Sequence, residues 1–502
     1  MASHILSIML FTPIVGAVVV LCLPKDKPTL LKWVALAISF IPLVLAGVLW
    51  FSYDRTSDVQ FQFKELADWI PAIGVRYHLA VDGISLPMVC LTTILTTLSL
   101  FYSFIIKERP KEFFAFFLLL ETAMLGVFMA LDFFLFYVFW ELSLVPMYFL
   151  IGIWGGPRRE YAAIKFFLYT LVGSVAMLLA IIGMYMETGT WDIVEMAAKQ
   201  PFAANPTLAA IAFWAVFLGF AIKVPVFPFH TWLPDAHVEA PTAGSVILAG
   251  ILLKLGAYGM IRILLPIFPA MFKQFAPVVA ALAAISIVYG ALVAMAQWDL
   301  KKLIAYSSVN HMGYVMLGVA AAAALGGSTA PEVVNSQAIA LNGAVLQMWN
   351  HGIITGALFF LVGVIYERAH TRDLKAFGGL GAKVPVYAGI LTITTFASLG
   401  LPGLAGFVSE FLVFRGAFAL IRPYAIISAL GIVVSAAYLL WKVIQQVLLG
   451  PLNERWAKLT DMKAWEVITL APLIFFMLIF GLYPAPILDL INKATLAIVK
   501  GL

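Results

Sequence analysis

Long apolar segments separated by short polar connections run along nearly the whole chain. A helix of about 20 apolar residues is long enough to cross the ~30 Å hydrocarbon core of a bilayer. The segments lie near residues 4–23, 30–52, 84–106, 113–131, 133–153, 163–187, 207–232, 241–265, 274–297, 302–324, 338–366, 384–420, 424–449 and 466–490. This pattern predicts an all-α polytopic membrane protein with about fourteen transmembrane helices.

Two of the predicted helices are interrupted by proline. The seventh contains Pro225 and Pro228, and the twelfth contains Pro402 within the glycine-rich segment 399–406. Proline lacks a backbone N–H and cannot continue the hydrogen-bond ladder of a helix. Broken helices at matching places in two halves are typical of inverted-repeat transporters. We therefore predict, from topology alone, two inverted five-helix repeats (helices 4–8 and helices 9–13), each with a broken helix.

This organisation divides the chain into four parts. Residues 1–112 hold helices 1–3, residues 113–265 the first repeat, residues 266–449 the second repeat, and residues 450–502 the last helix and a tail. Connections with odd numbers hold seventeen lysines and arginines, whereas the even connections and the C-terminal tail hold nine. Basic residues favour the cytoplasmic side. We therefore expect a bacterial inner (plasma) membrane protein with both termini on the periplasmic side.

Composition narrows the function further. The chain is 63% hydrophobic and 11% charged, far below the roughly 25% charged residues of soluble domains. The net charge of +5 reflects basic loops and does not indicate nucleic-acid binding. Cys22 and Cys90 are the only cysteines, and neither a phosphate-binding loop nor a dinucleotide fingerprint is present. We expect no metal and no cofactor in this chain, so a gradient or partner subunits must drive any ion movement.

Two lysines lie where the pattern predicts hydrocarbon. Lys223 precedes the first proline break, and Lys254 lies twelve residues past Thr242, about 18 Å into its helix. A buried charge in a membrane costs several kcal/mol and marks a functional site by default. The lysines are expected to load and release protons, and the alternative is a static structural ion pair.

Two glutamates lie at equal depth on neighbouring predicted helices. Glu121 is eleven residues before Asp132, and Glu141 is nine residues after it. At about 1.5 Å per residue, both lie roughly 14–17 Å from the same membrane surface. Such carboxyls can share or relay a proton. Alternatively, each is simply protonated and hydrogen-bonded within the bundle.

Further titratable groups follow in the second half. His311 lies about nine residues into the tenth helix (302–324), His351 in the middle of the eleventh, and Glu410 just after the second break. Histidine titrates near pH 6.5 and suits proton relay, although a lone histidine is often a hydrogen-bonded packing residue. Metal binding is disfavoured, because the histidines lack i, i+4 spacing and companion ligands. Arg415 is a candidate partner for Glu410.

Other polar residues have simpler interpretations. The segment 230–244 contains His230 and His237 and forms either an access vestibule or a loop of turns and caps. Asp82 is expected to cap the third helix. Lys165 and Lys442 are expected to snorkel or pack.

The residues from Phe229 to Ser245, with the run His-Thr-Trp-Leu-Pro-Asp-Ala-His inside them, resemble the hallmark of the proton-translocating antiporter-like family. That family includes the large membrane subunits of respiratory complex I and of Mrp-type cation/proton antiporters. The resemblance covers essentially the whole chain. The chain length, the glutamate Glu410 after the second break, and the segment 137–146 around Glu141 resemble the M-type members more than the L-type or Mrp members.

The resemblance implies a role for each buried group. Glu141 and Lys223 would form the coupled pair of the first half-channel, Lys254 the central relay continuing through His311 and His351, and Glu410 the terminal group. It also implies neighbours of L and N type, with FMN, iron–sulfur clusters and quinone in partner subunits. An Mrp-type antiporter subunit and a non-transporting membrane scaffold are the alternative hypotheses.

Overall fold

The computed structural model describes residues 4–502 and is almost entirely helical. In the described part, 12 helical segments are long and apolar enough to cross a membrane. They are α1 (Ile5–Cys22), α2 (Pro28–Ser52), α3 with a 3₁₀ turn (Ser85–Ile105), α4 (Pro110–Met129), α5 and α6 (Phe133–Leu142 and Leu144–Trp154), α7 (Arg159–Thr188), α9 (Pro206–Lys223), α11 to α13 (Thr242–Ile267), α14 (Pro269–Ala296), α16 (Pro331–Ala369), α20 with a π turn (Arg422–Leu448) and α21 (Ala464–Leu482).

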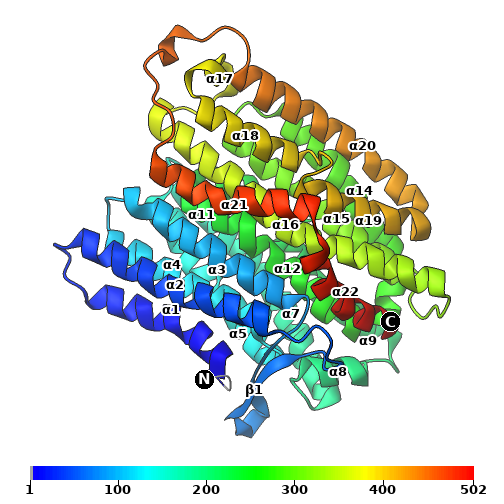
Figure 1. Ribbon diagram of the computed structural model, residues 1–502. Helices are drawn as coiled ribbons and strands as arrows, with labels where there is room; N and C mark the ends of the chain where they lie inside the picture. Colours follow the sequence, from blue (N-terminus) through cyan, green and yellow to red (C-terminus); the bar gives the residue numbers. More distant parts are fainter. Residues whose placement is uncertain (1–3) are drawn as a thin grey trace.

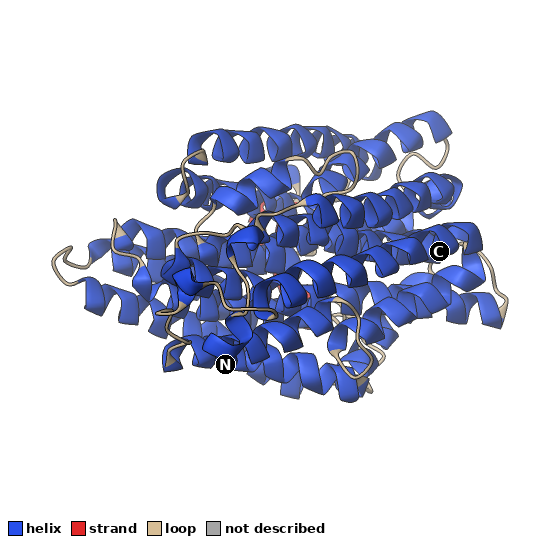
Figure 2. Cartoon of the chain, turned by 90° about the horizontal axis from the view of Figure 1, so that it is seen from above, coloured by secondary structure: helices blue, strands red, loops and turns tan. Residues whose placement is uncertain are grey.

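Helix α15 (Leu300–Ala324) and the two-part helix α18 (Pro385–Ser398) and α19 (Ala405–Leu420) pack within the same bundle. They are absent from the 12 because α15 carries several polar residues that lower its hydropathy, whereas the break leaves α18 and α19 with only 14 and 16 residues. The long helices run in one general direction, and the loops gather at the two ends of the bundle (Figures 1 and 2). The predicted all-helical, multi-pass class is confirmed, whereas the number fourteen and the two repeats stay predictions.

Both helix breaks lie where proline predicts them. Helix α9 ends at Lys223, and the chain becomes helical again only at α10 (Trp232–Glu239), after Pro225 and Pro228. The second break separates α18 from α19, and Gly400 and Gly403 take positive φ values of 78° and 95° there. Such backbone angles favour glycine. The two breaks leave helix ends inside the bundle, and turn and side-chain hydrogen bonds such as Val226 N–H to Ala221 O and Phe227 N–H to Ser286 Oγ satisfy part of their backbone.

The two halves share a local backbone pattern. Asp132 caps α5 and forms an isolated β-bridge with Asp192, which caps α8 (Ile193–Lys199). Asp299 caps α15 and forms an isolated β-bridge with Asp373, which caps the 3₁₀ turn Leu374–Ala376. Each bridge joins the start of the second helix of a predicted repeat to the segment after the third. An inverted repeat predicts this correspondence.

Three elements differ from the sequence expectations. A two-stranded antiparallel hairpin, β1 (Gln62–Ile70) and β2 (Val75–Val81), precedes α3. The last predicted span ends at Leu482 rather than at 490, because the Tyr483–Pro484 step interrupts the helix. The expected tail is an amphipathic helix, α22 (Ala485–Lys500), which packs against α16. The remaining elements are short: η2 (Pro71–Ile73), α17 (Leu380–Lys383) and η8 (Glu454–Trp456).

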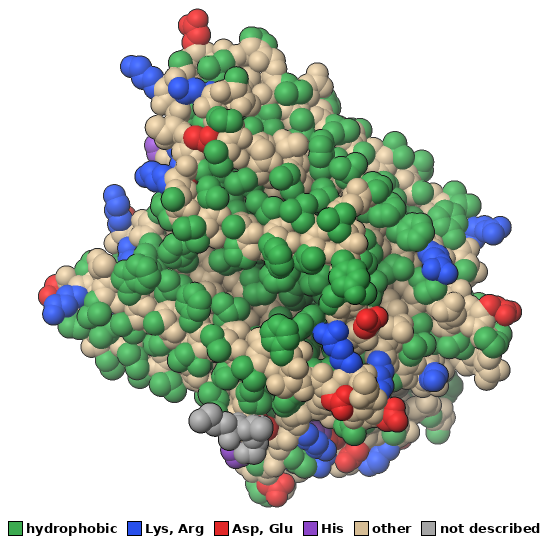
Figure 3. Space-filling view, in the orientation of Figure 1, with side chains coloured by type: hydrophobic (Ala, Val, Ile, Leu, Met, Phe, Trp, Pro, Cys, Tyr) green, Lys and Arg blue, Asp and Glu red, His purple; other side chains and the backbone are tan. Residues whose placement is uncertain are grey.

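The surface matches a membrane protein. Hydrophobic side chains cover the middle of the visible face, and charged side chains gather toward its two ends (Figure 3). The C-terminus and the N-terminal end of α1 lie at the same end of the bundle as β1 and α8, and α17 lies at the other end (Figure 1). Termini on one side require an even number of membrane crossings, which agrees with the predicted fourteen.

Candidate functional site

The centre of the molecule holds a buried lysine in direct contact with a histidine. Lys254 lies in α12 (Leu253–Gly259) with 0% of its surface exposed. Its Nζ lies 2.6 Å from His351 Nδ1 on α16 and donates to the carbonyl of Ala249. Ala249 belongs to a π turn, Leu248–Leu252. Such turns interrupt the regular helical ladder and occur often at functional sites.

The line of contacts continues from His351 to Glu410. The rings of His351 and His311 lie 5.7 Å apart between centroids, and His311 Nδ1 is 3.2 Å from Glu410 Oε1. The other His311 nitrogen lies 3.3 Å from Ser398 Oγ. Between these groups is a cavity of about 10 Å³, which is space for about one water molecule. Helices α12, α16, α15 and α19 therefore bring four predicted residues into one series, Lys254–His351–His311–Glu410.

The prediction that Arg415 is the partner of Glu410 is wrong. Among the described residues, the ion-pair contact of Glu410 is made with His311, not with Arg415. Arg415 is five residues away on α19, a spacing that turns the two side chains to different faces of the helix.

Lys223, with 1% of its surface exposed, lies at the end of α9. Its Nζ lies 3.2 Å from Ser143 Oγ and 5.1 Å from the centre of the Trp140 ring. Glu141 lies between Trp140 and Ser143 in the sequence. Nevertheless, no ion pair within 4.0 Å joins Glu141 to Lys223 in residues 4–502. The structure thus places the predicted pair on neighbouring elements without closing it.

Gly256 allows α9, which carries Lys223, to pack closely against α12, which carries Lys254. A Cβ atom built at Gly256 of α12 would lie 2.6 Å from the carbonyl oxygen of Phe220 and 3.1 Å from Lys223 Cβ. Only glycine permits this packing. Lys223 therefore lies against the helix that carries Lys254, two residues away from Gly256.

Glu121 is isolated. The side chain on α4 is fully buried, and neither carboxyl oxygen has a hydrogen-bond partner in the described part of the chain. The structure does not join Glu121 to Glu141. Its assignment to the relay stays a prediction.

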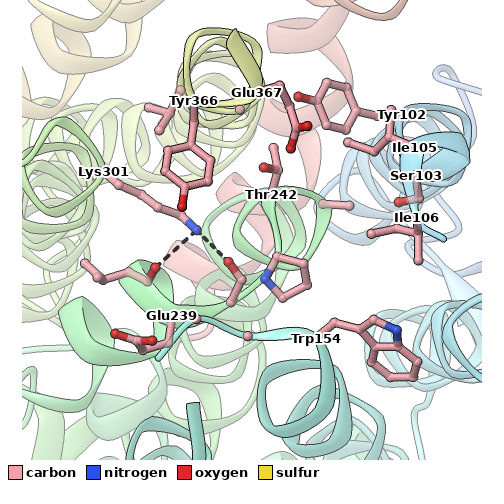
Figure 4. A pocket seen from close by; sticks show the side chains of 18 of the residues that line it. Tyr102, Ser103, Ile105, Ile106, Trp154, Glu239, Thr242, Lys301, Tyr366 and Glu367 are labelled. Atoms are coloured by element: carbon pink, nitrogen blue, oxygen red, sulfur yellow. Dashed lines mark hydrogen bonds between the residues drawn. The ribbon is translucent and has the colours of Figure 1, made fainter. Parts of the chain in front are cut away.

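The segment 230–244 forms α10 and the start of α11, and its end lines a pocket of about 290 Å³ (Figure 4). Lys301 points into this region and donates to the carbonyls of Ala240 at 2.5 Å and Val238 at 3.5 Å. His237 is buried beside it, with its ring stacked on Phe359 at 4.7 Å. Neither ring nitrogen of His237 has a partner among residues 4–502.

The structure also tests the simpler interpretations. Asp82 accepts from the backbone N–H groups of Ile84 and Ser85 and so caps the start of α3, as expected. Lys165 does not merely snorkel, because its Nζ lies 2.7 Å from Asp235. Lys442 packs over Trp298 and donates to a carbonyl. Within the described residues, no group of three or more histidine, cysteine and acidic residues could hold a metal.

Two polar groups were missed from sequence. Arg262, near the end of the predicted span 241–265, is buried in the α11–α13 helix and pairs with Asp82. On the hairpin side, His78 Nδ1 donates to Asp192 at 2.8 Å, and Arg76 lies 3.2 Å from the same carboxylate. Burial alone would raise the pKa of Asp192, but His78, the Glu195 N–H and Arg76 together hold that pKa below its ordinary value. The sequence contained no signal for pairs so distant along the chain.

This chain is similar in sequence and in structure to known membrane proteins. Residues 130–436 match the family model described as NADH:quinone oxidoreductase/Mrp antiporter, TM. NADH-quinone oxidoreductase subunit M of Rhodobacter capsulatus is 44% identical over 99% of this chain and 97% of its own length. A chain of respiratory complex I from Thermus thermophilus with bound NADH is 28% identical, with a TM-score of 0.86 over 99% of this chain and 100% of that one.

A chain of the Mrp complex from Dietzia sp. has a TM-score of 0.81 over 98% of this chain and 52% of that one, at 23% identity. That likeness shows the fold alone. The chain belongs to the membrane-embedded NADH:quinone oxidoreductase/Mrp antiporter family. Among its relatives, those at 41–44% identity over nearly the full chain are named NADH-quinone oxidoreductase subunit M.

Proposed function

We propose that this chain is the M-type, proton-translocating membrane subunit of NADH-quinone oxidoreductase. It is an enzyme subunit whose own part is to move protons, while quinone is reduced elsewhere in the complex. The observation that carries the proposal is the continuous buried series Lys254–His351–His311–Glu410. Relatives named subunit M support the assignment to this complex.

In the proposed path, Glu141 and Lys223 form the first half. The unpaired arrangement of Glu141 and Lys223 leaves the Lys223 charge free to act on Lys254, since α9 and α12 touch at Gly256. A positive charge that approaches favours release of a proton from Lys254, and closure of the Glu141–Lys223 pair removes that effect.

The second half carries the proton onward. A neutral His351 accepts from Lys254 at Nδ1, and its other nitrogen has no protein partner among the described residues. The small cavity beside His311 and Glu410 has room for a bridging water molecule. Proton transfer over such a series requires each group to lie within hydrogen-bond reach, directly or through one water. Glu410 is the terminal group.

The proposal extends to partners and location. We expect L-type and N-type subunits as neighbours in a bacterial inner membrane, with FMN, iron–sulfur clusters and quinone in partner subunits and none in this chain. The excess of basic residues in the odd connections supports termini on the periplasmic side. The Mrp alternative has weaker support, because the Mrp likeness is of fold alone. A scaffold would need a structural reason for each buried charge.

The test is Lys254→Met in the complete complex, in membrane vesicles. We expect an assembled complex whose NADH-driven proton pumping and, through tight coupling, quinone reduction are both lost. Lys442→Met is the matched control, because Lys442 is also buried but lies away from the series. Full pumping by Lys254→Met would refute the path. Copurification without flavin and iron–sulfur subunits would favour the Mrp alternative.

A further inference from the structure

The helix that carries Lys254 also carries a second buried cation that the proposed path does not use. Arg262 lies eight residues after Lys254, about 12 Å farther along the helix, beside the residues of α8 and of the C-terminal end with which it lines a pocket. Only 4% of Arg262 is exposed. Its Nη2 donates to Asp82, and its Nε has no hydrogen-bond partner in the described part of the chain.

A pocket of about 230 Å³ lies against Arg262. It is bounded by the loop after α2, by α8, by the end of α13 and by α22, and its lining includes Phe61, Ala197 and Ile498. Arg262 is the one charged side chain in this lining. The volume is sufficient for several water molecules. In the proposed orientation, this end of the bundle faces the outer water, and the pocket is the place where that water would meet Arg262.

The layer between Arg262 and Lys254 is aromatic. The Tyr258 ring lies 5.8 Å from the Arg262 guanidinium, packs at 5.3 Å on Phe128, and its hydroxyl donates to the Phe128 carbonyl at 3.2 Å. Tyr258 lies midway between Lys254 and Arg262 in sequence, and its ring contacts Arg262 although Arg262 lies in a π turn (Met260–Leu264) that interrupts the regular α-helix. Arg262 is thus the last polar group between the pocket and this layer.

Asp82 is the acidic group beside that cation, and its oxygens are occupied. One oxygen accepts from the backbone N–H groups of Ile84 and Ser85, each at 3.0 Å, and the other accepts from Arg262. Replacing Arg262 with a neutral residue would therefore leave Asp82 without its ion-pair partner.

We propose that Arg262 is a proton barrier that separates the outer pocket from Lys254. A fixed guanidinium repels an approaching cation, as arginines do in pores that exclude protons, and it keeps Asp82 occupied. Lys254 then exchanges protons with the outside only through His351, His311 and Glu410. This inference rests on the proposed function, since it assigns Lys254 to the proton path.

The test is passive proton leak through the complete complex in liposomes, without NADH. A potassium diffusion potential drives protons, and an internal dye reports pH. Arg262→Gln should let protons pass roughly tenfold faster, with a smaller NADH-driven pH gradient. Arg262→Lys, which keeps a cation, should leak protons no faster than the parent complex. Adding Asp82→Asn to Arg262→Gln should return the proton leak to the parent rate. Arg422→Gln, at an exposed arginine on the same side, is the matched control.

An Arg262→Gln complex as tight as the parent would overturn the barrier. A second measurement does not disturb Arg262. With Cys22→Ser and Cys90→Ser, Ala197→Cys places one thiol in the pocket, and a membrane-impermeant thiol reagent added outside should label it in the assembled complex. A thiol that does not react would also overturn the inference. It would mean that outer water does not enter the pocket, so no protons would arrive there for Arg262 to block. Full pumping by Lys254→Met would refute the path itself, whereas an inactive Lys254→Met with a tight Arg262→Gln refutes only the barrier.

Discussion

Gly256→Ala adds a single methyl group at the contact between the two lysine-bearing helices. The new Cβ atom would lie 2.6 Å from Phe220 O, 2.9 Å from Val224 Cγ2 and 3.1 Å from Lys223 Cβ, whereas ordinary contacts begin near 3.4 Å. The end of α9 must therefore withdraw by the difference between 2.6 and 3.4 Å, about 0.8 Å. The obstacle is a backbone carbonyl, which cannot turn aside like a flexible side chain. Overpacking of this kind costs about 1–3 kcal/mol.

The displacement has a direct consequence for the proposed path. A shift of about 0.8 Å is large for the Lys223 Nζ–Ser143 Oγ contact, because its 3.2 Å distance already lies at the upper end of hydrogen-bond range. A hydrogen bond to a charged group contributes about 1.5–3 kcal/mol, so we expect pumping and quinone reduction to fall roughly tenfold or more. Dye quenching and NADH oxidation in vesicles measure both, and a native gel measures assembly.

The matched control is Gly389→Ala in α18, where an added Cβ meets nothing within 4 Å. The same change of residue type there should leave activity intact. Equal pumping by the Gly256→Ala and Gly389→Ala complexes would show that the approach of α9 to α12 does not matter for transport.

Three further predictions test other parts of the structure. His351→Leu removes the group between Lys254 and His311, so vesicles should show an assembled complex without pumping; retained pumping would place the path elsewhere. Glu121→Gln should pump like the parent, since the Glu121 carboxyl has no hydrogen bond to a member of the series among the described residues, and a loss would return Glu121 to the relay. The lowered pKa of Asp192 means that its stabilisation is complete above the ordinary aspartate value of about 3.9 and is lost as pH falls through the lower folded value. Thermal unfolding of the purified complex should show an acid-dependent loss that Asp192→Asn reduces, and identical pH profiles would contradict that assignment.

Sequence patterns predicted what depends on near neighbours in the chain. Apolar length located the spans, and Pro225, Pro228 and Pro402 located both breaks, because a missing N–H acts within one helical turn. Charge in hydrocarbon identified Lys223 and Lys254 without any structure. The sequence predicted how far a residue lies from the membrane surface, but not which side chains it contacts. Glu121 and Glu141 have similar calculated depths, yet only the packing of the helices shows that the Glu121 carboxyl has no hydrogen-bond partner among the described residues.

Pairs that form across the fold escaped prediction for the same reason. Arg262 and Asp82 are 180 residues apart, and Arg262 lies near the end of the predicted span 241–265, where a charged residue is expected to face water. The hairpin was also missed. Its inner strand Val75–Val81 is buried mainly at its C-terminal end, so the strict alternation that signals a half-buried strand is absent.

The correspondence between the halves shows what sequence identity alone cannot reveal. The Phe133 N–H bonds the Trp191 carbonyl at 2.7 Å and the Ile193 N–H bonds the Leu131 carbonyl at 2.8 Å; the second half repeats this with Leu300 to Arg372 and Leu374 to Trp298. Backbone groups make these bonds, so only the capping aspartates must be kept in both halves. An inverted repeat can therefore persist in geometry after its side chains have diverged. In the predicted repeat, such divergence would let the first half carry Lys223 at its break and the second half carry Glu410.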